Sequence, residues 1–405
     1  MNRLFITLAL VCIVLSATAQ EIRRSWSGEL EAMGQKLPIV LNLIDGKCTL
    51  DSPAQGATGI PATIDLLTKD SIKVSVKSIG ASYAARYVDG RLEGTFTQAG
   101  MKLPLNMKET SPDGPKRPQT PKAPFPYTTE EVTFTNAKAG ATLAGTLTVP
   151  KGGAKCVMIM VTGSGPENRD EEVYAHKPFA VIADRLARAS IATLRYDDRA
   201  TGKSVGGMDP NCTTKDFAED ALAGIEWLRA QKRFKKIGII GHSEGGTIAF
   251  ILGAQKAVDF IVSLAGTSVK GDSVILEQNK ALGGPMASGL TMEQLYALPA
   301  IKKAISENAW YRYFMAYDPQ NDIAKIKCPV MALNGSKDLQ VIATQNLPAL
   351  RRTLPKNKRN IIKEYEGLNH LFQHCEKGTP DEYFKIEETF SEEVINDIIA
   401  WVKKL

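Results

Sequence analysis

The chain has 405 residues, of which 43% are hydrophobic and 23% are charged, a balance typical of folded domains and not of a low-complexity or fibrous protein. Its formal net charge is +6, and the lysines and arginines are scattered along the chain. The sequence therefore gives no support for nucleic-acid binding.

The first residues have the pattern of a secretory signal peptide. The basic residue Arg3 precedes an apolar stretch at residues 4–15, and small residues follow at 17–19. We expect a signal peptide at residues 1–19 and a mature chain that starts near Gln20 and is exported to the periplasm or secreted. A membrane anchor is the competing interpretation, but the stretch is shorter than the roughly 20 apolar residues that span a bilayer. We therefore expect no membrane span.

Residues 20–110 lack helical periodicity, and their short strand-like runs are separated by Gly, Pro, Asp and Asn, which predicts a small all-β domain. The segments 28–38 and 94–104 share Gly, Gly, Lys, Leu and Pro at matching positions. They predict two similar hairpins, which would let a small sheet or barrel close.

Prolines then recur at every third position within residues 111–127, the period of polyproline II, and predict a linker. A proline motif that binds a partner domain is the alternative.

From residue 128 to 405, apolar strand-like runs alternate with helix-like stretches. This alternation predicts a mostly parallel sheet flanked by helices. The expected strands are residues 131–134, 143–149, 157–161, 191–194, 237–240, 260–264, 330–333 and 361–365, the first two forming an antiparallel lead-in. The alternation stops at about 267–320, where we expect a helical lid over the carboxyl ends of the strands.

A serine lies between an apolar strand and a helix within residues 236–249. Residues 241–245 fit the G-x-S-x-G nucleophile elbow, whose glycines stand where a side chain would collide across the tight turn. Ser243 is the expected nucleophile. The helix that follows directs its free amides to the same point, so we expect the Glu244 N–H to be an oxyanion donor. A glycine-rich turn that contains a serine by chance is the alternative.

An acid and a base follow in the order of a Ser-Asp-His triad. Asp338 lies on the loop after the penultimate expected strand, and His370 lies on the loop after the last one. Among the four histidines, His370 or His374 must be the base, and the loop position favours His370. A metal site at this pair lacks a third ligand, and an N-cap is the alternative for Asp338. We expect no metal.

The second oxyanion amide is expected at Ser164, in the glycine-containing loop after the third strand. Two nucleotide-binding patterns fail nearby. Residues 163–165 lack the third glycine of a dinucleotide fingerprint because Asn168 stands there. Residues 202–204 imitate the end of a P-loop, but Asp197 occupies the place of its first glycine. The sequence thus predicts no cofactor.

These motifs together resemble the α/β-hydrolase superfamily, and within it the serine aminopeptidase-like group of exported carboxylesterases. The resemblance covers residues 130–405 and is carried, beside the triad, by residues 163–170, 194–204 and 328–338. Ala200 stands where relatives usually have glycine. The resemblance implies an α/β-hydrolase fold, here preceded by the small all-β domain.

The expected function is that of an exported serine hydrolase, a carboxylesterase acting on a small-molecule ester. His370 would take the proton of Ser243, Asp338 would orient the imidazole, and the amides of Ser164 and Glu244 would hold the oxyanion. A serine peptidase or aminopeptidase of the same fold is the alternative within this mechanism. A non-catalytic protein that binds a glycan or a partner is the alternative from another class. The residues do not indicate acyl specificity or oligomeric state.

Overall fold

The chain folds into two compact units in the computed structural model, which describes all residues except 1–22, 33–34, 56, 113, 284–286 and 288. The first unit is Met1–Asp51 with Thr58–Gly114, and the second is Ser52–Ala57 with Pro115–Leu405. Each has its own hydrophobic core. The expected signal peptide lies outside the described residues. No helix in the described part is long and apolar enough to cross a membrane.

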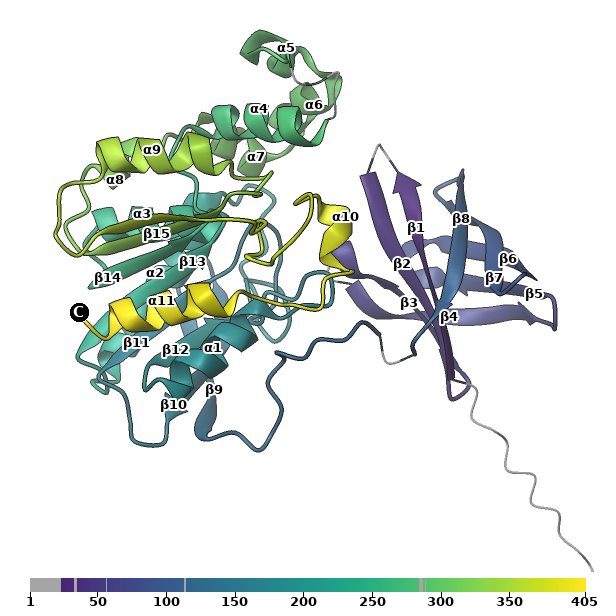
Figure 1. Ribbon diagram of the computed structural model, residues 1–405, viewed down its shortest axis with the longest axis horizontal. Helices are drawn as coiled ribbons and strands as arrows, with labels where there is room; N and C mark the ends of the chain where they lie inside the picture. Colours follow the sequence, from purple (N-terminus) through teal and green to yellow (C-terminus); the bar gives the residue numbers. More distant parts are fainter. Residues whose placement is uncertain (1–22, 33–34, 56, 113, 284–286, 288) are drawn as a thin grey trace, which may run out of the picture. The chain divides into compact units, whose positions relative to one another are not determined.

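The first unit is a closed barrel of eight strands (Figure 1). The strands are β1(Arg23–Ala32), β2(Gln35–Ile44), β3(Lys47–Ser52), β4(Ala57–Leu67), β5(Ser71–Val76), β6(Ala81–Val88), β7(Arg91–Gln98) and β8(Met101–Thr110). β1 pairs antiparallel with both β2 and β8, which closes the barrel. The two similar segments fall in the pairs β1–β2 and β7–β8, on either side of this closure.

Two polar side chains of the proline-rich segment bind it to the rest of the second unit, to which residues from Pro115 onwards belong. The Arg117 guanidinium donates to four backbone carbonyl oxygens of that unit at 2.8 to 3.2 Å. The Gln119 side-chain amide donates to the Phe390 carbonyl oxygen at 2.7 Å. Residues 114–126 form neither helix nor strand. The period of the prolines does not reveal these contacts, because they depend on the polar residues between them.

The second unit contains an eight-stranded sheet of order β16-β15-β14-β13-β11-β12-β10-β9. Its strands are β9(Tyr127–Asn136), β10(Ala141–Pro150), β11(Cys156–Val161), β12(Ala192–Tyr196), β13(Lys236–His242), β14(Phe260–Leu264), β15(Val330–Gly335) and β16(Ile361–Tyr365). β10 is antiparallel to β9 and β12, and all other pairs are parallel. The predicted parallel sheet with an antiparallel lead-in is confirmed.

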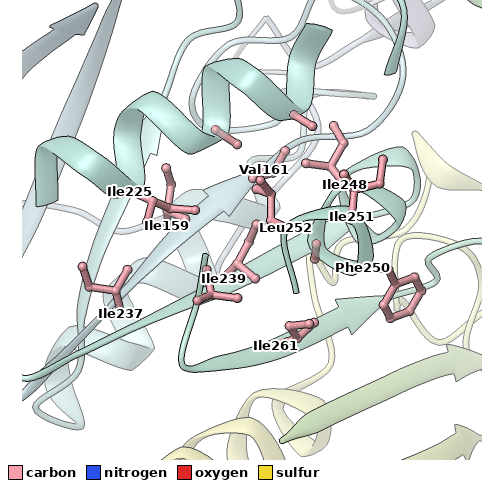
Figure 2. Close-up of a cluster of buried hydrophobic side chains, with 14 of the residues drawn as sticks. Ile159, Val161, Ile225, Ile237, Ile239, Ile248, Phe250, Ile251, Leu252 and Ile261 are labelled. Carbon is pink, nitrogen blue, oxygen red and sulfur yellow. The ribbon is translucent and has the colours of Figure 1, made fainter. Parts of the chain in front are cut away.

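Helices cover both faces of this sheet. One face carries α1(Pro178–Arg188) and α11(Glu392–Val402). The other carries α2(Thr214–Ala230), α3(Glu244–Ala254) and α9(Ala343–Thr353). Neighbouring residues of one strand enter opposite layers, so that Ile239 packs with α2 and α3 while Ile240 packs with α1 and α11. Figure 2 shows Ile239 and Ile261 among the aliphatic side chains of the layer that contains α2 and α3. Burial on both faces explains why the strands are continuously apolar.

The segment expected as a helical lid contains α4(Gly271–Leu282), α5(Met292–Ala297), α6(Pro299–Glu307), α7(Ala309–Ala316) and α8(Gln320–Ile323). Helices α4 to α7, here called the cap helices, lie together in Figure 1. They have a small apolar cluster of their own around Leu295, Ile301 and Met315. The insertion is therefore a packed subdomain rather than a long loop. The last helix before α11 is the short α10(Pro380–Tyr383).

Candidate active site

Ser243 occupies the tight turn between β13 and α3. Its backbone has φ 54° and ψ −116°, a strained conformation for a residue with a side chain. A Cβ atom on Gly241 would collide with the carbonyl oxygen of Gly245, and one on Gly245 would collide with that of Val161. The two glycines are needed because these backbone segments touch. This is the geometry that the sequence predicts for a nucleophile elbow.

His370 and Asp338 form a buried pair on the loops that leave β16 and β15. His370 Nδ1 lies 2.8 Å from Asp338 Oδ2, and the two residues are 4% and 2% exposed. Asp338 Oδ1 accepts the backbone N–H groups of Gln340 and Val341, both at 2.9 Å. The N-cap of the following helix, α9, is Ile342 and not Asp338. The carboxylate is thus held by its own loop and directed at the histidine.

The second candidate base lies elsewhere. His374 Nδ1 is 2.8 Å from a carboxylate oxygen of Glu388, and its side chain is 64% exposed. Among the described residues, no group of His, Cys, Asp and Glu side chains is arranged to hold a metal ion. The structure therefore pairs His370, and not His374, with Asp338.

The two expected oxyanion donors come from different loops. Glu244 is the first residue of α3, where backbone N–H groups have no acceptor within the helix. Ser164 lies on the loop after β11, next to Gly163, whose Cβ position would be 3.5 Å from Ser243 Cβ. Neither amide donates a hydrogen bond to another group in the part of the chain that the structure describes. Both amides are available to a ligand oxygen.

His242, the residue before Ser243, joins the elbow to the loop of His370. Its Nδ1 lies 2.8 Å from Glu171 Oε1, and its Nε2 lies 2.8 Å from the carbonyl oxygen of His370. A carbonyl oxygen only accepts, so Nε2 carries a proton. Burial disfavours the imidazolium, but the Glu171 carboxylate outweighs this effect, and the pKa of His242 is raised. This Glu171–His242 brace was not predicted from the sequence.

Three further carboxylates lie near the turn, on the buried Glu244 and on the half-buried Glu167 and Asp198. Burial raises the pKa of Asp198 and of Glu244 to about 7. Burial, and then the neighbouring carboxylate of Glu171, raise the pKa of Glu167 well above its ordinary value. Within the described residues, none of the three has a basic partner within 4.0 Å. The sequence shows that these acids flank the motifs, but spacing alone does not show that all three have raised pKa values.

A cavity of about 590 Å³, here called the chamber, opens beside the oxyanion loop. Its wall includes Gly163 and Ser164 of that loop, Glu244 of the elbow and Trp310 of α7. The Trp310 indole N–H donates to Glu244 Oε1 at 2.7 Å. The cap helices thus contribute to the wall of the chamber and contact the first residue after the expected nucleophile.

The segment 194–204, which carries part of the family resemblance, contacts the chain that follows the oxyanion loop. Asp197 accepts the Arg169 guanidinium at 2.8 Å and the Lys203 backbone N–H at 2.9 Å. Ala200 has φ 56°, in the left-handed region that favours glycine. Glycine adopts this conformation without strain, whereas Ala200 adopts it at a cost of about 1 kcal/mol.

Two comparisons of the sequence with known proteins found a family model and a relative that match parts of the chain. Residues 176–321, which include Ser243, match the family model described as serine aminopeptidase, S33. The chain is 28% identical over 275 residues to the esterase EstD of Thermotoga maritima. That alignment covers 65% of this chain and 66% of the relative, so the chain spans just under two thirds of the length of the relative.

Three solved structures of similar chains illustrate the third comparison. The esterase Pf2001 of Pyrococcus furiosus is 19% identical with a TM-score of 0.47, covering 72% of this chain and 96% of that one. Est1E of Butyrivibrio proteoclasticus, solved with ferulic acid, is 16% identical with a TM-score of 0.46, covering 67% and 98%. A dienelactone hydrolase of Anabaena variabilis is 16% identical with a TM-score of 0.43, covering 69% and 98%.

The raised pKa of Glu244 predicts how stability depends on pH. Between about pH 4.5 and pH 7 the unfolded chain has released this proton while the folded chain still binds it, so the free energy of unfolding falls as pH rises. Glu244→Gln removes this dependence and keeps an acceptor for Trp310. We expect the variant to gain up to about 3 kcal/mol relative to the parent between pH 4.5 and pH 8. Urea unfolding at several pH values measures the difference, and parallel curves would contradict it.

Proposed function

We propose that this chain belongs to the serine aminopeptidase-like esterase group of the α/β hydrolases and is a serine carboxylesterase that cleaves small-molecule esters through an acyl-enzyme. The observation that carries the proposal is the strained turn at Ser243, to which the buried His370–Asp338 pair is joined through His242. The 28% identity to an esterase supports the preference for esters.

In the first half of the proposed reaction, His370 takes the proton of the Ser243 hydroxyl as the oxygen attacks the ester carbonyl carbon. The Asp338 carboxylate stabilises the imidazolium and fixes its Nδ1 proton. The amides of Ser164 and Glu244 bind the oxyanion of the tetrahedral intermediate. The intermediate then expels the alcohol, which takes its proton from His370, and leaves an ester on Ser243.

In the second half, His370 removes a proton from water as the water oxygen attacks the acyl-enzyme. The second tetrahedral intermediate uses the same two amides. Its collapse breaks the bond to the Ser243 oxygen, which recovers a proton from His370, and releases the carboxylic acid. The proposed groups all belong to the chain, and the proposed reaction uses no cofactor.

A peptidase or aminopeptidase is the second candidate, and the match of residues 176–321 to serine aminopeptidases favours it. The same residues would act, but the leaving group would be an amine, which requires a proton from His370 before it departs. Parallel assays with an ester and with the corresponding amide distinguish the two. Faster cleavage of the amide would favour the peptidase.

We also propose that the protein is exported. The support is the basic start, short apolar stretch and small residues of positions 1–19 in the sequence. Expression of the full chain in a bacterium with a Sec pathway should yield a product that begins near Gln20. Intact-mass analysis measures that start, and a product that retains residues 1–19 would contradict the proposal.

The first test of the catalytic proposal is covalent labelling with a fluorophosphonate, which reacts with activated serines. The chain without residues 1–19 should gain one adduct by intact mass, Ser243→Ala should gain none, and Ser306→Ala, which removes an exposed serine of α6, should label like the parent. An adduct on Ser243→Ala, or none on the parent, would contradict the proposal. In the second case the glycan- or partner-binding hypothesis takes its place.

Asp338→Asn should lower kcat by roughly 10³- to 10⁴-fold. The backbone amides of Gln340 and Val341 would keep the carbonyl oxygen of the new amide at the Oδ1 position, so its NH₂ group would face His370 Nδ1. The imidazole would then be held in the tautomer that cannot accept the proton of Ser243. Steady-state ester hydrolysis measures the loss, with Asp70→Asn on the barrel surface as control. A loss below about tenfold would contradict this arrangement.

A further inference from the structure

We propose that the chamber binds an alkylammonium group, so that the preferred ester carries a positive charge in its acyl part or in its alcohol part. This inference rests on the proposed esterase function and names a substrate class for the same site. Three features of the chamber wall carry it: an excess of carboxylates, an unpaired oxygen of Glu244 and a set of aromatic side chains.

Acidic groups outnumber basic groups on the described wall of the chamber. One guanidinium, that of Arg199, lines it together with four carboxylates, those of Asp198, Asp209, Asp220 and Glu244. Arg199 Nε lies 2.7 Å from Asp220 Oδ2, so this cation is already matched by one of the four. The remaining carboxylates have no basic partner within the described residues. The electrostatic field of the wall therefore favours a cation.

Glu244 provides the second observation. The residue is 2% exposed, and its Oε1 accepts the indole N–H of Trp310. Its Oε2 is buried and accepts no hydrogen bond of ordinary geometry within the described residues, although the Thr214 side chain lies near enough to lower the pKa of this carboxyl in part. A buried carboxylate oxygen without a partner is costly, and the chamber is the side from which a ligand can reach this residue. A positively charged ligand would compensate its charge directly.

The acid–base properties of the wall agree with a cationic ligand. Burial raises the pKa of both Glu244 and Asp198 to about 7, and the neighbouring carboxylates of Glu244 and Asp220 contribute to the raised pKa of Asp198. A cationic ligand in the chamber would favour the ionised forms of both groups. Binding would therefore be coupled to the release of protons from these two carboxyl groups.

Aromatic side chains select the kind of cation. Tyr196, Phe217 and Trp310 line the chamber, and the Arg199 guanidinium carbon already lies 5.5 Å from the centroid of the Phe217 ring. Aromatic rings together with carboxylates bind alkylammonium groups through cation–π and Coulomb attraction. A metal ion instead requires several oxygen ligands at close distance, and no such group occurs among the described residues. An organic ammonium group fits this wall better than a metal ion.

The chamber is placed for a substrate group. Gly163 and Ser164 of the oxyanion loop belong to its wall, and the Cβ position of Gly163 is 3.5 Å from Ser243 Cβ. Its volume of about 590 Å³ lies within the usual range of small-molecule sites. Ser243 itself does not belong to the wall, so we place the cation in the chamber and the ester carbonyl at its edge, beside the oxyanion loop.

The test compares esters that differ in charge and not in shape. Acetylcholine has a trimethylammonium group in its alcohol part, where 3,3-dimethylbutyl acetate has a neutral tert-butyl group. Betaine ethyl ester and ethyl 3,3-dimethylbutanoate differ in the same way in the acyl part. Hydrolysis is followed by proton release, and each kcat/KM is divided by the rate of hydroxide-catalysed hydrolysis of the same ester. We expect a preference of about tenfold or more for the cationic member of at least one pair, and the pair that shows it identifies the part of the ester that enters the chamber.

Glu244→Gln should reduce this preference to about threefold or less, because it removes the charge and keeps the size of the side chain. Asp198→Asn is the second variant, which tests the same charge from another loop. Glu226→Gln, on the exposed side of α2, removes a carboxylate outside the chamber and should keep the full preference. A preference that survives unchanged in both chamber variants would overturn the assignment of the site.

The outcome also separates this inference from the proposed function. Hydrolysis of the neutral esters without any preference for the cationic ones would overturn the alkylammonium site and leave the esterase proposal intact. No fluorophosphonate adduct on Ser243 would overturn both. If Ser243 is labelled but no ester of either pair is turned over, labelling in the presence of choline or of 3,3-dimethylbutan-1-ol decides. If choline slows the labelling of Ser243 more than the neutral alcohol does, the site is supported. If the two compounds slow labelling equally, or if neither slows it, the site is overturned.

Discussion

The close approach of the backbone at Gly241, Gly245 and Val161 is the constraint on which the candidate site depends. A Cβ atom on either glycine would collide with a carbonyl oxygen across the turn. This contact places Ser243 in a strained conformation at the edge of the sheet and directs the first amides of α3 to the same point. The strain is sustained because the strand before the turn and the helix after it are both buried in the core (Figure 2). Rigidity here is a precondition for a reactive serine.

The carboxylates around this turn set an electrostatic requirement on any reaction that forms an oxyanion. Ionised Glu244 and Asp198 would disfavour a second negative charge nearby, whereas neutral carboxylic acids would not. Burial raises the pKa of both groups to about 7, so both are partly protonated near neutral pH. A substrate cation meets the same requirement in another way, because it offsets the ionised acids. The acidic wall and a negatively charged intermediate are therefore compatible in both cases.

Much of this arrangement follows from the sequence because it is local. The apolar runs predict the strands of the sheet, and the glycines of the elbow predict the turn at Ser243. Asp338 and His370 follow from their positions after strands, since the carboxyl ends of parallel strands meet at one edge. The Glu171–His242 brace and the raised pKa of Glu167 do not follow, because they depend on which side of a loop faces the core. The contacts of Arg117 are missed for the same reason.

The hydrogen bond between Trp310 and Glu244 links the cap helices to α3, and these two parts are held in place by different packing contacts. Glu244 belongs to α3, whose position is fixed by the sheet, whereas Trp310 belongs to the cap helices, which pack around a small cluster of their own. A change in the cap can therefore reshape the chamber and alter the surroundings of the Glu244 carboxylate without disturbing the turn at Ser243. The backbone amide of the same residue remains held by α3. The backbone amide of Glu244 thus serves the proposed chemistry, whereas its side chain serves the proposed selection of the substrate.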